Sequence, residues 1–135
     1  MTSPHPPTPT GATVGTDLLE IDRVRALLER MPERALHRFL TERERAQTRH
    51  PGTATFLAGR IAAKEAVYKA IYGYVREGIR WQWIEIVRGE DGRPLVSLHG
   101  SWSGLLWEGR LTLSISHTHT LAQAVAVYFP GSDAK

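Results

Sequence analysis

Two carboxylates and a lysine are the residues of this sequence best suited to phosphate chemistry. Asp17 ends the segment Gly15-Thr16-Asp17, and Glu65 and Lys69 lie four residues apart in an expected helix. Two carboxylates with no soft ligand nearby suit a hard cation such as Mg²⁺, which takes oxygen donors and keeps several waters. Such an ion takes its remaining ligands from a substrate's phosphates. Two structural roles stay open: Asp17 as a helix cap, and Glu65 with Lys69 as an ordinary helix ion pair.

A second polar cluster occupies residues 114–119, where Ser, His and Thr side chains follow an alternating strand. Hydroxyls, backbone amides and imidazoles in one short segment are typical of a phosphate cradle. The alternative is that these histidines are surface residues at a strand end. Three other catalytic classes are excluded because the GxSxG elbow, the GxxxxGK[ST] loop and the HExxH pair do not occur.

The composition indicates one globular domain with an anionic partner. The chain has 135 residues, of which 41% are hydrophobic and 23% charged, and this excludes wholesale disorder. It has no cysteine, so disulfides, zinc-thiolate sites and thiol nucleophiles are excluded. Of the 17 basic residues 14 are arginine, which suits phosphate and carboxylate recognition, although a coding bias would give the same count.

No membrane or nucleic-acid partner is expected. The longest apolar run, Ala124–Phe129, is far shorter than the ~20 residues of a spanning helix. The proline-rich start does not resemble a signal peptide, so we expect a cytoplasmic protein. A basic nucleic-acid-binding module is the alternative, but the basic residues alternate with acids and no RNP, KH or helix-turn-helix pattern occurs.

The chain must position these groups with a mixture of helices and strands. Helical spacing, capping residues and Pro or Gly breaks define the first half. Its expected elements are a loose proline-rich tail over residues 1–12, a strand at Ala12–Leu19, a helix at Glu20–Arg30, short helices from Pro32 and near Glu42, and a long helix from Thr53 or Thr55 to Gly73.

The second half is predicted to be mainly β, because apolar and polar residues alternate around an Asp-Gly turn. Its expected elements are strands at Trp81–Val87 and Leu95–Leu98, a short helix over residues 101–107, a strand at Leu111–Ser116 and a last strand at Leu121–Phe129 that is either central or covered on both faces. The long helix is apolar around almost its whole circumference, which predicts burial. Its charges therefore need partners.

The segment Gly59–Ala70 (GRIAAKEAVYKA) resembles the signature helix of the holo-acyl-carrier-protein synthases, which are small phosphopantetheinyl transferases. Further segments resemble other parts of that family in the same order. GTDLLEIDRV is similar to its Gly-x-Asp motif, IEIVRGEDGRPLVSL to its central hairpin and SISHTHTLAQAVAV to its Ser-x-Ser/Thr-His segment. The resemblance covers roughly Ala12–Val127. One departure is Ile71–Arg76, which stands where the family usually has a short glycine-rich turn.

The resemblance implies an α+β fold of the 4′-phosphopantetheinyl transferase type, with a long buried helix packed on a small antiparallel sheet. It implies one domain over residues 13–130, with 131–135 a loose C-terminus, and a homotrimer with coenzyme A in clefts between subunits. The implied reaction transfers phosphopantetheine from coenzyme A to a serine of apo-acyl carrier protein. Adenosine 3′,5′-bisphosphate is released, Mg²⁺ is the cofactor, and the reaction supports fatty acid biosynthesis.

The resemblance also implies roles for individual residues. Asp17 and Glu65 match the metal-binding acids, and with Lys69 they are the expected catalytic residues. Glu65 and a metal-bound water stay open as the base that accepts the serine proton. The expected contacts to coenzyme A and its phosphates are Arg60, Lys64, Lys69, Ser116, His117 and Thr118.

For the acidic carrier protein the first helix offers complementary charge. The expected contacts are Arg23 and Arg30, together with Arg25, and Arg34 and Arg38 are weaker candidates. A solvated basic face is the alternative for each. A third kind of protein, a catalytically dead relative that only binds the carrier, would be expected to lose a metal acid, yet Asp17 and Glu65 are both present. The tryptophans Trp81, Trp83, Trp102 and Trp107 are expected either in an oligomer interface or in the core of one subunit.

Overall fold

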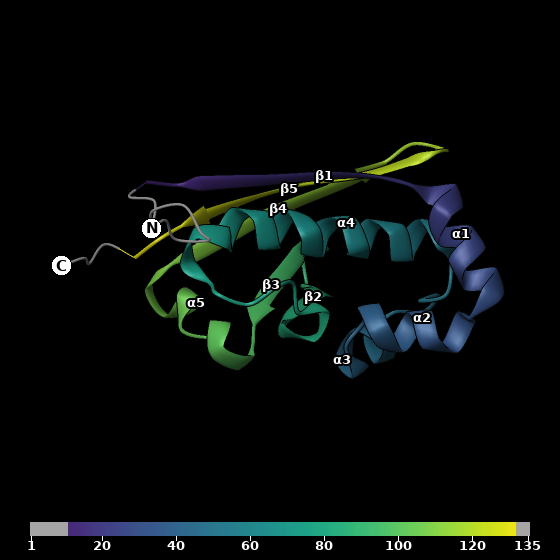
Figure 1. Ribbon diagram of the computed structural model, residues 1–135, viewed down its shortest axis with the longest axis horizontal. Helices are drawn as coiled ribbons and strands as arrows, with labels where there is room; N and C mark the ends of the chain where they lie inside the picture. Colours follow the sequence, from purple (N-terminus) through teal and green to yellow (C-terminus); the bar gives the residue numbers. More distant parts are fainter. Residues whose placement is uncertain (1–10, 132–135) are drawn as a thin grey trace, which may run out of the picture.

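One long helix, α4 (Ala54–Ile71), is the element on which most of the others pack (Figure 1). Thr53 begins it, since its side chain accepts a hydrogen bond from the Phe56 backbone N–H. Twelve of its 18 residues are buried, which confirms the expected burial. This computed structural model describes residues 11–131. The predicted proline-rich tail and loose C-terminus lie outside the described residues, except at Gly11, Ala12 and Gly131.

A three-stranded antiparallel sheet lies along one side of α4. Its order is β1 (Thr13–Glu20), β5 (Leu121–Phe129), β4 (Arg110–His117), so the last strand is central as predicted. Because side chains alternate along a strand, one face of β5 buries Ala124 and Ala126 in the core shared with α4. The opposite face of the sheet leaves Val14 and Leu18 60% and 61% exposed, and no described helix covers it.

Three short helices cover one end of α4: α1 (Ile21–Arg30), α2 (Pro32–Phe39) and α3 (Glu42–Gln47). Pro32 starts α2, and Thr41 and Glu44 form the predicted capping box at the start of α3. These helices and the near half of α4 enclose a second core cluster around Ile21, Leu40 and Leu57. Glu44 is buried, so the cap also places a carboxylate inside the protein.

A separate two-stranded hairpin is formed by β2 (Ile84–Arg88) and β3 (Pro94–Leu98). It lies on the side of α4 away from the three-stranded sheet (Figure 1). The prediction of a strand from Trp81 is wrong for its first three residues, because Trp81–Trp83 form a 3₁₀ turn, η2. Side chains of α3 bind the free edge of β2. Glu44 accepts the Ile86 N–H, and the Gln47 amide bonds both the N–H and the carbonyl of Arg88. The helix thus occupies an edge that would otherwise expose unpaired backbone groups.

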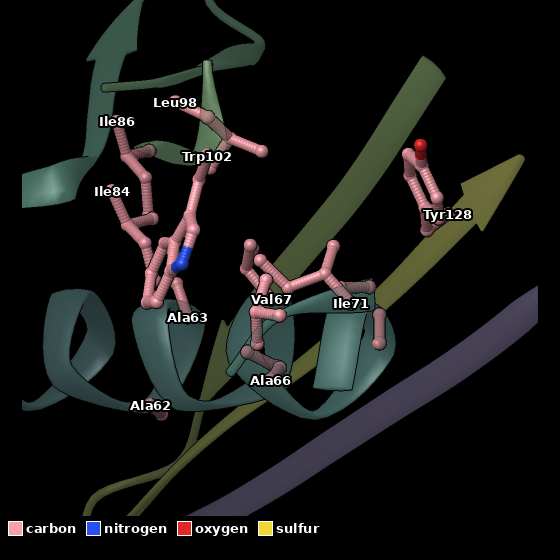
Figure 2. Packing of buried hydrophobic residues seen from close by; sticks show 14 residues of the cluster. Ala62, Ala63, Ala66, Val67, Ile71, Ile84, Ile86, Leu98, Trp102 and Tyr128 are labelled. Carbon is pink, nitrogen blue, oxygen red and sulfur yellow. The ribbon is translucent and has the colours of Figure 1, made fainter. Parts of the chain in front are cut away.

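One of the four tryptophans is buried in the core of the subunit, and two more are partly buried in ring contacts within it. Trp102, in the 3₁₀ turn η3 (Gly100–Trp102), is 1% exposed and packs among Ile84, Ile86 and Ala63 (Figure 2). Trp83 meets it edge to face at 5.1 Å, and Trp81 meets Phe39 at 4.9 Å. Trp107 is the exception at 83% exposed. The predicted helix over residues 101–107 is divided between η3 and α5 (Leu105–Glu108).

Helix α4 continues into a 3₁₀ turn, η1 (Tyr72–Tyr74), and a loop then leads to η2. Glu77 lies in this loop and anchors it through hydrogen bonds. Its carboxylate accepts hydrogen bonds from Trp102 Nε1 and Ser101 Oγ, both at 2.8 Å, and its carbonyl accepts one from the Tyr68 hydroxyl at 2.7 Å. The hydrogen bond from Trp102, followed by that from Ser101, lowers the pKa of Glu77 from 4.5 to about 2. These bonds hold the connection against the core.

The lowered pKa of Glu77 predicts a loss of stability in acid. A depressed carboxyl pKa stabilises the fold above the unfolded value of 4.5, and that contribution disappears as the pH falls through about 2. We expect the difference in unfolding free energy between wild type and Glu77→Gln to be constant near neutral pH and to shrink below 4.5. Urea unfolding against pH measures it, with Glu90→Gln at the exposed turn as control. A difference that persists unchanged in acid would contradict the role of Glu77.

Candidate active site

Asp17, Glu65 and Lys69 come together where β1 crosses α4. The Lys69 ammonium donates to Asp17 Oδ1 at 3.2 Å and to the Thr16 carbonyl at 2.9 Å. Glu65 lies one turn earlier on the same side of α4. Burial raises its pKa, the charge of Asp17 raises it further, and Lys69 opposes both. The predicted acids and lysine therefore form one electrostatic cluster.

Gly15 sets the distance between β1 and α4. It is buried and faces the helix, and a Cβ at this position would lie 2.7 Å from the Ala70 nitrogen and would overlap the Ala66 carbonyl oxygen. Only glycine therefore allows the strand this close. Asp17 is two residues further along and points to the same face, which places its carboxylate at Lys69. The Gly-x-Asp spacing thus has a packing cause, which the sequence analysis did not identify.

The two carboxylates fit a hard cation. Asp17 has a side chain only 15% exposed, and its charge acts directly on Glu65. A cation between two such acids would relieve their repulsion, and oxygen is the donor that Mg²⁺ prefers. Across residues 11–131 no group of three or more His, Asp or Glu side chains is arranged so that it could hold a metal ion. The described chain therefore offers two protein donors, and the other ligands must be waters or substrate oxygens.

Glu65 lines a groove of about 630 Å³ between α4 and the first two helices. Arg23, Arg30 and Arg38 contribute the charged part of its lining. The apolar part is contributed by Leu19, Val24, Ala26, Leu27, Phe39, Ile61 and Trp81. A carboxylate thus shares an elongated groove with three guanidinium groups.

Not every arginine of these helices lines the groove. Arg25 instead pairs with Asp22 one turn away on α1, and Arg34 is exposed elsewhere on α2. Arg23 and Arg30 are thus the expected carrier contacts that the groove brings near Glu65. Arg38, a weaker candidate in the sequence, joins them.

A second cavity, of about 440 Å³, lies on another side of α4 and is cationic. Arg60, Arg88 and His117 line it. The Arg60 guanidinium lies over the Phe56 ring at 4.6 Å, and its buried Nε has no hydrogen-bond partner among the described residues. Burial lowers the pKa of Arg60, Glu44 opposes this, and Arg88 adds to it. Three basic side chains and an unpaired donor suit an anion.

Arg88 is a cavity residue that the sequence analysis missed. Its strand was predicted, but no local signal shows that the end of the β2–β3 hairpin lies over the N-terminal half of α4. That placement depends on α3, whose Gln47 side chain holds the backbone of Arg88.

The predicted cluster over residues 114–119 is divided by the strand geometry. His117 lines the cationic cavity, whereas Ser116, its neighbour in β4, must point to the opposite face of the sheet. The Thr118 hydroxyl accepts the backbone N–H groups of Thr120 and Leu121, and its own N–H donates to the Leu121 carbonyl. Thr118 thus shapes the β4–β5 turn, and His117 is the member of this cluster that reaches the cavity.

The structure contradicts the expected phosphate contact of Lys64. Its side chain is 0% exposed, and its ammonium donates to Glu44 Oε1 at 2.7 Å and to the carbonyls of Phe39 and Trp81 at 2.6 and 3.0 Å. A lysine has three donors, so none is left for a ligand. Glu65, the next residue on α4, lines the groove. Lys64 points into the protein.

The predicted site residues therefore form two sets. The groove set holds Glu65 with Arg23 and Arg30, and Asp17 and Lys69 adjoin it. The cavity set holds Arg60 and His117. No residue lines both hollows, because α4 lies between them.

Comparison with known proteins decides the family. Residues 13–126 match the 4′-phosphopantetheinyl transferase superfamily. The chain belongs to that superfamily. It is 38% identical over 118 residues to the holo-[acyl-carrier-protein] synthase of Chlorobaculum tepidum, covering 87% of this chain and 97% of that one. It is 44% identical over 119 residues to that of Moorella thermoacetica, covering 84% and 90%.

Solved structures of synthases from this superfamily have the same fold as this chain. The complex of the Chronobacterium ammoniagenes synthase with coenzyme A superposes with a TM-score of 0.71 at 31% identity, covering 90% of this chain and 98% of that one. The Helicobacter pylori holo-[acyl-carrier-protein] synthase, also solved with coenzyme A, gives 0.72 at 28% identity, covering 85% and 98%. The predicted α+β transferase fold is therefore confirmed. No helix among the described residues of this transferase is long and apolar enough to span a bilayer.

The close approach of β1 to α4 makes a testable prediction for Gly15→Ala. The added methyl would collide with backbone atoms of α4 that cannot move separately, so we expect the unfolding free energy to fall by roughly 2 to 4 kcal/mol. Gly78→Ala is the matched control, because a Cβ there meets nothing within 4 Å. Denaturant unfolding of both variants measures the difference. Equal stability for Gly15→Ala and wild type would show that β1 does not need this contact.

Proposed function

We propose that this chain transfers the 4′-phosphopantetheine group of coenzyme A to a serine of apo-acyl carrier protein and releases adenosine 3′,5′-bisphosphate. The observation that carries the proposal is the cluster of Asp17, Glu65 and Lys69, which adjoins an arginine-lined groove in a chain of this family. Relatives across most of its length are holo-[acyl-carrier-protein] synthases, and two solved relatives hold coenzyme A. The cytoplasmic location and the link to fatty acid biosynthesis stay predictions.

Asp17 and Glu65 are the residues that would hold Mg²⁺. When bound there, the ion supplies positive charge to the pyrophosphate oxygens of coenzyme A. Lys69 supplies further charge from the protein. Within the described residues its ammonium donates to Thr16 and Asp17, which leaves one N–H for a phosphate oxygen or for the departing bisphosphate. Its side chain is 51% exposed and accessible to such a ligand.

The cationic cavity supports a phosphate-binding role for Arg60 and His117, with Arg88 added by the structure. Because this cavity and the groove lie on different sides of α4, one coenzyme A reaches both sets most directly across an interface between two protomers. The exposed sheet face with Val14 and Leu18 offers apolar area for such an interface. These features support the homotrimer with coenzyme A between subunits.

The groove supports carrier-protein binding. Arg23, Arg30 and Arg38 line it beside Glu65, so an acidic partner that docks there brings its serine to the catalytic cluster. Opposite charges on the two partners would also speed their encounter at low salt.

The proposal is tested by mixing the protein with apo-carrier protein, coenzyme A and Mg²⁺. Mass spectrometry of the carrier should show the added mass of one phosphopantetheine. A carrier that stays unmodified, together with salt-sensitive binding of the protein to random oligonucleotides, would favour the basic nucleic-acid-binding module instead.

The metal site predicts a shared defect in Asp17→Asn and Glu65→Gln. Each variant removes one anionic oxygen ligand, so we expect turnover at saturating coenzyme A to fall by at least about 100-fold. In wild type, Mg²⁺ should raise the melting temperature, and this shift should be lost in both variants. Calorimetry with and without Mg²⁺ provides that readout without any substrate. Near-normal turnover in either variant would remove that residue from the ligand set.

Lys69 and Arg23 should separate chemistry from carrier binding. Lys69→Ala should lower kcat by about 10- to 100-fold, because its charge acts on the phosphates. Arg23→Ala should instead raise the KM for carrier protein about fivefold and weaken its salt dependence. Arg25→Ala, on the same helix but paired with Asp22, is the matched control and should change that KM by less than about twofold. The reverse pattern in steady-state kinetics would overturn these assignments.

A further inference from the structure

The buried ion pair of Lys64 and Glu44 joins α4 to the elements that form one wall of the groove. Both side chains are 0% exposed, and their charged atoms lie 2.7 Å apart. Glu44 also accepts the backbone N–H groups of Thr41 and Ile86, each at 2.7 Å. The pair thus bonds α4 to α3 and, through Glu44, to the start of α3 itself and to β2.

The two carbonyls bound by Lys64 belong to groove residues. The Phe39 carbonyl ends α2 and the Trp81 carbonyl begins η2. Their rings meet edge to face at 4.9 Å, and both line the groove that also holds Glu65. Lys64 precedes Glu65 on α4, so one helical segment carries both the catalytic acid and the ammonium that binds the Phe39–Trp81 wall.

We propose that Lys64 is a positioning residue, which holds the Phe39–Trp81 wall at a fixed place relative to Glu65 and so shapes the groove for the carrier protein. The inference rests on the proposed function. It gives this lysine a different task from Lys69 on the same helix, which is exposed to substrate.

The chemistry of the pair favours positioning over net stabilisation. Burial lowers the pKa of Lys64, and the charge and hydrogen bond of Glu44 oppose that shift. A buried pair of this kind often contributes no more stability than well-packed apolar side chains would. What an apolar chain lacks is three directed donors at one point, and these join α2, α3 and η2 to α4. Without them the carbonyls of Phe39 and Trp81 lose their partner and the wall is free to shift.

The expected kinetic effect is selective for the carrier protein. The cationic cavity depends on Arg60, on His117 and on a hairpin that Glu44 and Gln47 bind directly. Loss of the Lys64 ammonium removes neither Glu44 nor Gln47, so we expect their bonds to the hairpin to remain. The KM for coenzyme A should therefore change little, whereas the KM for the carrier should rise.

The first experiment is steady-state kinetics of full-length wild type and Lys64→Met, with Mg²⁺, varying apo-carrier protein and coenzyme A separately. We expect the carrier KM to rise about tenfold, with kcat and the KM for coenzyme A within about threefold of wild type. An unchanged carrier KM in Lys64→Met, beside an active wild type, overturns the positioning role alone. A wild type that transfers nothing overturns the proposed function and this inference with it.

A stability-matched control excludes a merely structural effect. Val67→Ala also truncates a fully buried α4 side chain, but Val67 packs in the core away from the groove. Its unfolding free energy should fall while its carrier KM stays within about twofold of wild type. A tenfold rise in carrier KM for Val67→Ala would mean that any destabilisation of α4 loosens the groove, which would overturn the assignment.

Chemical rescue keeps the proposal testable even if Lys64→Met folds poorly. The chain contains no cysteine, so Lys64→Cys introduces a single thiol. The unfolded variant is alkylated either with an aminoethyl group, which restores an ammonium at nearly the length of lysine, or with a propyl group, which is equally long and uncharged. After refolding, the aminoethyl protein should return the carrier KM to within about threefold of wild type, and the propyl protein should not. Equal carrier KM values for the two proteins would contradict the role of the ammonium.

Discussion

The contact between β1 and α4 at Gly15 is the constraint on which the cluster of Asp17, Glu65 and Lys69 depends. The strand lies so close to the helix that any side chain at this position would collide with the helix backbone. This approach places Asp17 within 3.2 Å of Lys69 and lets its charge raise the pKa of Glu65. A strand further from the helix would break the contact between Asp17 and Lys69 and would weaken the effect of the Asp17 charge on Glu65.

The four charges of α4 show how one apolar helix serves several tasks. Lys69 and Glu65 remain partly exposed beside Asp17, where charge and access to a ligand matter together. Arg60 lies on the Phe56 ring, and its buried Nε has no partner among residues 11–131. Lys64 is fully enclosed by hydrogen bonds. An unpaired buried charge costs several kcal/mol, and the partners of Lys64 and Lys69 that prevent this are Glu44 and Asp17, which lie outside α4.

The groove and the cationic cavity lie on different sides of α4. The groove with Glu65 and the cavity with His117 share no lining residue. Coenzyme A carries its 3′-phosphate and its pyrophosphate on the same ribose, and its pantetheine arm ends in a thiol. Under the proposed function, an interface between two protomers would bring the groove of one and the cavity of the other to one such ligand. The sheet face that carries Val14 and Leu18 points away from α4, and its exposed apolar side chains could form such an interface.

The sequence predicted the elements that depend on local rules. The capping box at Thr41 and Glu44, the cap at Thr53 and the central position of the last strand are all confirmed, because each follows from residues close in the chain or from apolar patterning. It did not predict the 3₁₀ turn at Trp81–Trp83, because the aromatic residues there fit a strand equally well and their packing against other segments decides the backbone.

The sequence by itself determined the motif chemistry, the helices and strands, and the family, since spacing and residue type are local properties. The tertiary structure decided the partners and the exposure of each charged side chain. Lys64 and Lys69 are the same residue type five residues apart on one helix, yet one is enclosed by Glu44 and the other lies open beside Asp17. That difference comes from α3 and β1, which are distant in sequence, and no pattern within α4 could reveal it.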